Sequence, residues 1–154
     1  MNTPTLGYQK DTEISKLEIA RIQLEEAIAM FIGEKFLCAL TLAGASEEIL
    51  SRLLNARGQP SVVEQSVEAV LNLKRSTGLA GLADATDKQL FKNWNTARNA
   101  AKHHNATESE TVVLNLFDEA YWMVRRALEN AKRLGLNVCN ELDFENWVIV
   151  NVNM

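Results

Sequence analysis

Glycine and proline are scarce in this sequence, which has seven Gly and two Pro among its 154 residues. Because these residues most often interrupt helices and strands, their scarcity predicts long regular elements joined by short connections. Cysteine is scarce too. Cys38 and Cys139 are too few for a disulfide framework and too far apart for a CxxC zinc motif, so we expect two free thiols.

The sequence also lacks a long hydrophobic run, an excess of positive charge and a secretory signal. No apolar segment approaches the roughly 20 residues that a membrane span requires, and the first fifteen residues show no basic stretch followed by an apolar one. Sixteen Lys and Arg oppose twenty Asp and Glu, and this net charge of -4 argues against a broadly basic nucleic-acid surface. We expect a cytoplasmic protein without membrane association.

The sequence does contain a repeated helical pattern. The chain is 47% hydrophobic, as a globular domain requires. Its apolar residues recur at three- and four-residue steps, which predicts an all-α domain. The pattern predicts helices over about residues 13–31, 35–56, 62–76, 87–103 and 109–134. The first two should form an antiparallel hairpin. Together the segments predict an up-and-down bundle of about five helices over residues 1–135.

Three helix starts carry a capping-box pattern, in which two side chains satisfy backbone donors at the helix N-terminus. These are Ser61 with Glu64, Thr86 with Gln89, and Thr107 with Glu110. Residues 136–154 form a short C-terminal extension of unclear structure, which ends in WVIVNV. This extension is either a short helix or an edge strand, and a strand there could pair with its twin in a dimer.

The predicted helix over residues 87–103 has one wholly polar face, at about 100° per residue. This face carries Asn95, Arg98, Asn99, Lys102 and His103. Arginine, lysine and histidine together suit the binding of an anion such as phosphate. The alternative is that the cations pair with Glu47, Glu48 or acids of the helix predicted to follow.

Other polar and aromatic residues have simpler interpretations. His104 lies on the apolar face of the same predicted helix, which favours a histidine at the edge of the core over a catalytic one. Trp94 and Tyr121 are predicted to be core residues, whereas Trp122 and Trp147 are undecided. Adjacent histidines on one helix cannot face one metal ion together, so we expect no metal site and no cofactor.

The helix over residues 35–56 is apolar around much of its circumference, and it contains Glu47 and Glu48. We interpret the two glutamates as solvated or ion-paired side chains. The small residues near Gly44 would let another helix approach closely. The helix is therefore either the central core helix of the bundle or part of a dimer surface.

The spacing of Arg98, Asn99 and His103 resembles the motif of HEPN-domain proteins, a superfamily of helical bundles rich in metal-independent ribonucleases. Four residues separate Arg98 from His103, and the polar residue that many active members carry after the arginine is Asn99. The motif also lies on a late helix of a small all-α domain. The resemblance covers residues 13–134 and leaves the C-terminal extension unexplained.

The resemblance implies a homodimer that brings two motifs together to cleave RNA. His103 of each protomer would share the acid and base roles, and Asn99 would orient the imidazole. Arg98 and Lys102 would hold the phosphate, with Asn95 as a further RNA-binding residue. The product would carry a 2',3'-cyclic phosphate or the 3'-phosphate derived from it. Such a ribonuclease would fit a toxin, phage-defence or stress-response system, with an antitoxin-like protein partner.

Two other interpretations stay open. The first is a non-catalytic HEPN-like module that binds a protein partner, RNA or a nucleotide, and the net negative charge of the chain favours it. The second is a helical scaffold in which the spacing of Arg98 and His103 is coincidental. In that case replacing either residue changes only stability.

Overall fold

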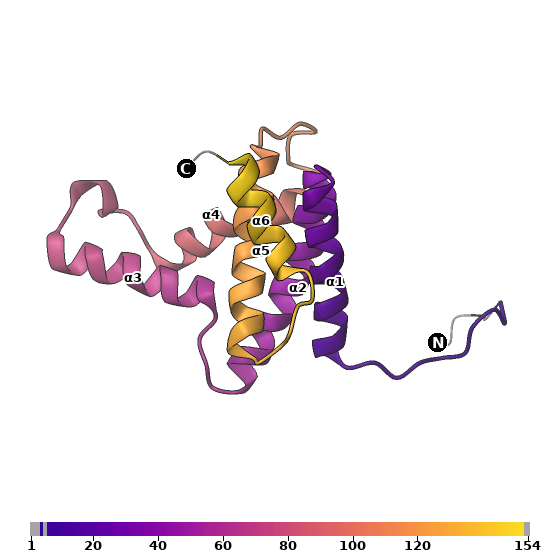
Figure 1. Ribbon diagram of the computed structural model, residues 1–154. Helices are drawn as coiled ribbons and strands as arrows, with labels where there is room; N and C mark the ends of the chain where they lie inside the picture. The colour runs from indigo at the N-terminus through magenta and orange to yellow at the C-terminus, as the bar shows by residue number, and fades with distance from the viewer. Residues whose placement is uncertain (1–3, 5, 153–154) are drawn as a thin grey trace.

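The computed structural model describes residues 4 and 6–152, and within them it is all-α (Figure 1). This part of the chain forms six α-helices and one short 3₁₀ helix, and contains no strand, which confirms the predicted fold class. The helices are α1 (Lys16–Ile32), α2 (Phe36–Ala56), α3 (Val62–Thr77), α4 (Asp87–Ala100), α5 (Leu116–Arg133) and α6 (Glu141–Asn151), with η1 (Ala80–Leu82) between α3 and α4. Residues 1–3 and 5 of the N-terminal segment, and residues 153 and 154 of the predicted extension, lie outside the described residues.

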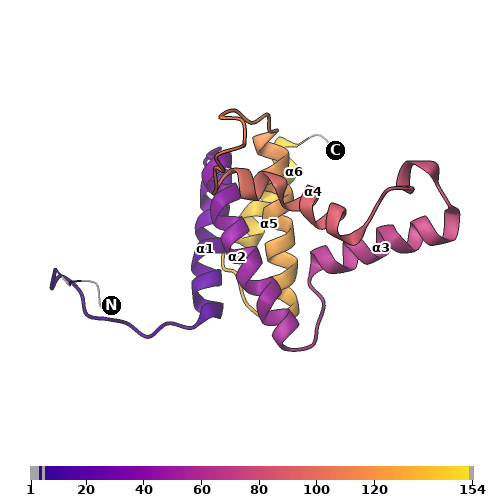
Figure 2. The same ribbon diagram turned by 180° about the vertical axis from the view of Figure 1, so that it is seen from behind.

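Four helices form the bundle, and α3 projects from it. α1, α2, α5 and α6 run side by side, and α3 extends away to one side before α4 returns to the bundle (Figures 1 and 2). α1 and α2 form the antiparallel hairpin that the sequence predicts. The five-helix arrangement is wrong in detail, because α3 projects from the bundle, only the C-terminal half of α4 packs against it, and α6 takes a place in it. No helix in the described ranges is long and apolar enough to cross a membrane.

The core combines small residues where helices approach one another with large side chains that fill the centre of the bundle. Several alanines with no exposed surface let α1, α2 and α5 approach one another, and Ser46 Oγ of α2 donates to the carbonyl oxygen of Ala20 in α1 at 2.7 Å. Phe31, Leu40 and Val124 fill the centre and are fully buried. α2 is therefore the central core helix. Cys38 and Cys139 are exposed free thiols, as predicted.

Aromatic rings form a cluster at one end of the bundle. Phe31 lies at its centre, with neighbouring ring centroids 5.1–5.6 Å away. The cluster consists of Phe31, Phe36, Phe117, Tyr121, Phe144 and Trp147. Tyr121 and Trp147 thus pack against the core, whereas Trp122 is exposed. The prediction that Trp94 is a core residue is wrong, because α4 leaves the bundle there and the side chain is exposed.

Local capping signals place two of the predicted helix starts correctly. At α3 the reciprocal capping box between Ser61 and Glu64 is complete, and Gly78 ends the helix with a left-handed φ of 60°. At α4 the Thr86 side chain accepts a hydrogen bond from the backbone N–H of Gln89. The Gln89 amide bonds to Asn93 instead of returning to Thr86, so half of that box is formed.

The predicted end of the fourth helix is wrong by one turn. α4 ends at Ala100, so His103 and His104 lie in the connection to α5 and not on helical faces. The backbone N–H groups of Lys102 and His103 still donate to the carbonyl oxygen of Asn99, at 3.1 and 2.9 Å. The run of polar residues that follows has low helix propensity, and the chain must turn there to reach α5.

The predicted start of the fifth helix is also wrong. α5 begins at Leu116 with Asn115 as its N-cap, and Thr107 and Glu110 form no capping box. The β-branched residues before Asn115 disfavour a helix, and Val113 would gain nothing from one, because its side chain is 99% exposed. A loop over residues 101–115 therefore crosses the end of the bundle (Figure 2).

The C-terminal segment is a helix. The strand alternative for WVIVNV, and with it the pairing of two such strands, is wrong for the described residues. Phe144 and Val148, four residues apart, bury one face of α6 in the bundle. Glu141 and Asp143 in the first turn stabilise the helix through a favourable interaction with its dipole. Burial of this stripe outweighs the strand preference of the valines.

Candidate functional site

The predicted site residues gather at the C-terminal end of α4, on two different sides of it. One side packs against α2 and α5, and it receives Asn95 and Arg98. The other side faces an open cleft, and it presents Asn99 and His103. The structure therefore does not bring Arg98 and His103 of one protomer to the same cavity.

The packed side is organised around Glu47 of α2, whose side chain is 2% exposed. Its two carboxylate oxygens accept from four side chains: Arg98 at 3.3 Å, Arg126 at 3.1 Å, Ser51 at 3.0 Å and Asn130 at 3.5 Å. We call these five residues the Glu47 cluster. A buried carboxylate requires such partners, because burial of an unpaired charge is costly.

The Arg98 side chain packs closely against α2 at Gly44. A Cβ atom placed on Gly44 would lie 2.6 Å from Cγ and 2.8 Å from Cδ of Arg98, so any larger residue would displace the arginine. The Arg98 side chain is 13% exposed. The absence of a side chain at Gly44 thus admits an arginine of the same chain.

Arg126 of α5 holds the last turns of α4 from the other direction. Its Nη1 donates to the carbonyl oxygen of Trp94 at 3.0 Å, and its Nη2 donates to Asn95 Oδ1 at 3.0 Å. Arg126 and Arg98 share the single carboxylate of Glu47, and the Nε atoms of both arginines are buried without an acceptor among the described residues. The cluster fixes the turn from which Asn99 and His103 extend.

Lys102 is also paired. Its Nζ forms an ion pair with Glu48 at 3.9 Å, and Glu48 also accepts a hydrogen bond from Arg52 at 3.1 Å. The Arg52 guanidinium, with Arg98 and Lys102, lowers the pKa of Glu48 below its ordinary value. These pairs confirm the alternative that the cations of the polar face neutralise Glu47 and Glu48.

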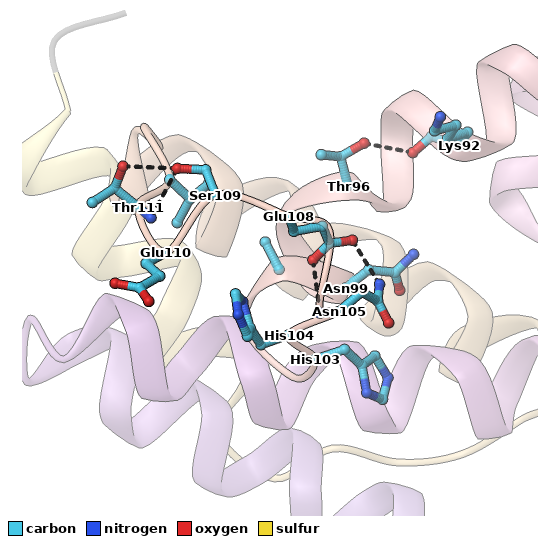
Figure 3. Close-up of a pocket in the computed structure, with 12 residues that line it drawn as sticks. Lys92, Thr96, Asn99, His103, His104, Asn105, Glu108, Ser109, Glu110 and Thr111 are labelled. Atoms are coloured by element: carbon cyan, nitrogen blue, oxygen red, sulfur yellow. Dashed lines mark hydrogen bonds between the residues drawn. The ribbon is translucent and has the colours of Figure 1, made fainter.

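The cleft on the other side of α4 has a volume of about 1030 Å³. It lies between the end of α4 and the loop that follows (Figure 3). A cavity of this size can hold a ligand as large as a nucleotide. Its polar lining includes Lys92, Asn99, His103, His104, Glu108 and Glu110.

Both histidines are exposed and line the cleft. Their imidazoles point in opposite directions from the backbone, His104 towards Glu110 and His103 away from it (Figure 3). The interpretation of His104 as a residue at the edge of the core is wrong, because the chain has left the helix before it. Asn99 and His103 remain one turn apart through the bond between their backbone groups.

Glu108 is the carboxylate that is held in place within the cleft. Its Oε1 accepts from the side-chain amide of Asn105 at 2.6 Å, and its Oε2 accepts from the backbone N–H of Asn105 at 3.2 Å (Figure 3). These bonds lower the pKa of Glu108 below its ordinary value, and the imidazoles of His104 and His103 add to the effect. Glu108 therefore faces the cleft as an ionised group at neutral pH.

Sequence reasoning missed Arg126, Asn130, Glu108 and Lys92. Asn130 carried a signal, because it is a polar residue among the apolar positions of a predicted helix. Glu108 carries none, because the pattern of Thr107 and Glu110 around it predicts a helix start. Comparisons with models of known protein families, with curated proteins and with solved structures give no match to this chain.

Proposed function

We propose that this chain is a HEPN-like, metal-independent endoribonuclease that acts as a homodimer, with His103 as a proton-transferring residue. The observation that supports the proposal most strongly is that Asn99 and His103 face one open cleft of about 1030 Å³. They are the polar residue and the histidine of the HEPN-like motif. The third motif residue, Arg98, immediately precedes Asn99 in the sequence, and its bond to Glu47 fixes the helix end that carries them.

RNA cleavage without a metal needs three functions. A base takes the proton of the 2'-hydroxyl, an acid protonates the leaving 5'-oxygen, and a positive charge stabilises the phosphorane between them. An imidazole can serve as base or acid near neutral pH. His103 of each protomer would share these roles, and the product would end in a 2',3'-cyclic phosphate.

The contacts of Arg98 and Lys102 change the roles that the resemblance implies for them. Both cations already have carboxylate partners, so we assign Arg98 to positioning the end of α4. Asn95 has the same supporting role through Arg126. Lys92 is the lysine that lines the cleft, and we assign it to the RNA backbone.

The experiment is cleavage of a labelled RNA pool by the purified protein in EDTA. His103→Ala should lower the cleavage rate by about 10²- to 10⁴-fold, the usual contribution of one acid–base group. His104→Ala is the matched control, since it removes the other exposed imidazole of the cleft, which lies outside the motif, and we expect a loss of less than about tenfold. Cyclic-phosphate ends on the products identify the reaction. An inert wild-type protein, or cleavage that survives in His103→Ala, overturns the proposal.

A non-catalytic HEPN-like module is the second candidate, and the charge of the cleft favours it. Its lining contains one lysine, no arginine and two glutamates, Glu108 and Glu110, which weakens the attraction for free RNA. In that case the protein would bind RNA, a nucleotide or a protein partner and leave RNA intact. Fluorescence anisotropy with the same labelled RNA separates binding from cleavage.

Either function is compatible with a cytoplasmic toxin, phage-defence or stress-response system that includes an antitoxin-like protein. A homodimer is part of the ribonuclease proposal. Size-exclusion chromatography with light scattering measures it directly, and a monomer at all concentrations would remove the composite site from the proposal.

A further inference from the structure

The proposed reaction needs a proton acceptor, and one histidine cannot accept and donate in the same step. In the scheme above the acceptor comes from a second protomer. Within one protomer, however, the cleft already holds a carboxylate, because Glu108 lines the same cavity as Asn99 and His103. This arrangement arises from the loop over residues 101–115.

The Glu108 carboxylate is more firmly placed than an ordinary surface glutamate. Two donors of Asn105 hold its two oxygens, and each oxygen keeps a lone pair for a further proton. Figure 3 shows this carboxylate beside Asn99, with the histidines on the chain segment below it. Fixed orientation is what distinguishes a useful proton acceptor from a solvated charge.

We propose that Glu108 is the proton acceptor of the cleft, so that one protomer carries both the acceptor and the donor, His103. The inference rests on the proposed ribonuclease function. Glu108 takes the proton of the 2'-hydroxyl, and the 2'-oxygen forms a bond to phosphorus. The bond from phosphorus to the 5'-oxygen breaks, and protonated His103 gives its proton to that oxygen. The products are a 2',3'-cyclic phosphate and a free 5'-hydroxyl.

Glu110 is the other carboxylate of the cleft, and it lacks these features. Among the described residues it accepts no hydrogen bond from a cleft side chain, and it lies beside His104 (Figure 3). The charged and titratable groups that face the cleft are therefore Lys92, Glu108, Glu110 and the two histidines. Glu110→Gln changes the net charge of the cleft by the same amount as Glu108→Gln, which makes it the matched control.

The first test is the pH dependence of kcat/KM for RNA cleavage in wild type, Glu108→Gln and Glu110→Gln. We expect Glu108→Gln to lose about 10²- to 10⁴-fold, and Glu110→Gln to lose less than about tenfold. In the wild type the activity should fall at acidic pH as Glu108 is protonated, and this limb should be absent from the residual activity of Glu108→Gln. Because the pKa of Glu108 is lowered by Asn105, the limb should lie at or below the usual range of glutamate.

The second test mixes two inactive variants, Glu108→Gln and His103→Ala, after their subunits have exchanged. If acceptor and donor belong to one protomer, a mixed dimer contains no complete cleft, and activity stays absent. If the two groups act across the dimer, each mixed dimer contains one complete site out of two. With about half of the dimers mixed, about a quarter of the wild-type activity should then return, and that result would overturn the inference.

The outcomes separate this inference from the function on which it rests. A Glu108→Gln variant that cleaves like wild type while His103→Ala is inactive overturns the role of Glu108 and leaves the ribonuclease proposal standing. A wild-type protein that cleaves no RNA overturns both. Loss of activity in Glu108→Gln with equal melting temperatures, and with the acidic limb removed, supports the inference.

Discussion

The two sides of the end of α4 differ in almost every physical property. The side of the Glu47 cluster is buried, and its arginines are committed to a carboxylate of the same chain. The cleft side is exposed, and its histidines are free to meet a ligand. Residues that lie side by side in the sequence, Arg98 and Asn99, therefore have different surroundings. In the proposed ribonuclease the motif would combine a structural half, Arg98, with a chemical half, Asn99 and His103.

The largest effect should come from removing the central carboxylate of the buried side. Glu47→Gln leaves two buried guanidiniums without a counter-charge, and we expect a loss of about 3–5 kcal/mol in the free energy of unfolding. The adjacent Glu48→Gln removes an exposed partner and should cost less than about 1 kcal/mol. Urea denaturation of both variants measures the difference. Equal losses would contradict the contrast between a buried and an exposed pair.

The next effect concerns the seat of Arg98. Gly44→Ala places a methyl group within 3 Å of that side chain, and we expect a net loss of about 1–2 kcal/mol from overpacking. In an Arg98→Ala background the same substitution should stabilise by about 1 kcal/mol, because alanine favours a helix over glycine. Gly81→Ala, which has open space around it, is the control. Thermal denaturation measures both effects. If Gly44→Ala changes the stability in the same direction with and without Arg98, the close contact between Gly44 and Arg98 is disproved.

A smaller effect is the pH dependence of the Glu48 pairs. Arg52, Arg98 and Lys102 hold the pKa of Glu48 below its ordinary value in the folded state. Its contribution to stability is therefore present at neutral pH and is lost as the pH falls through the lowered pKa. The difference between wild type and Glu48→Gln should be under about 1 kcal/mol at pH 7 and should vanish once the pH is below the lowered pKa of Glu48. Denaturation curves at several pH values test this, and a difference that grows on acidification would refute it.

The smallest effect on stability should come from the cleft side. Asn99→Ala and His103→Ala remove exposed side chains, while the backbone bond between the two residues remains. Each should change the free energy of unfolding by less than about 0.5 kcal/mol. A loss of more than about 1 kcal/mol in urea denaturation would show that these residues belong to the structural half of the motif.

Much of the secondary structure was predictable because its signals are local. The starts of α3 and α4 follow from Ser61 and Thr86, whose side chains bond to backbone groups three residues later. The first two helices follow from their apolar stripes and from the break at Gly33. The prediction failed at the end of α4 and at the start of α5. There the polar run after α4 and the β-branched residues before Asn115 disfavour the helix that the Thr107 and Glu110 pattern predicts.

The candidate site was predictable only in part. The sequence indicated that Arg98, Asn99 and His103 belong together, and it left open whether Arg98 binds an anion or a glutamate. That choice depends on Glu47, which is 51 residues away, and on Arg126, which is 79 residues from Glu47. No local pattern records such a pairing. Glu108 was missed for a related reason, since its contacts exist only because a loop replaces the expected helix.

By itself, the sequence determined that this protein is all-α and where most of its helices begin, and it indicated a candidate site near residue 100. These features depend on spacing and capping, which act over a few residues. The tertiary structure decided which side of α4 is buried, which cation meets which carboxylate, and that α6 completes the bundle. Those outcomes depend on desolvation, and desolvation exists only once distant segments have packed together.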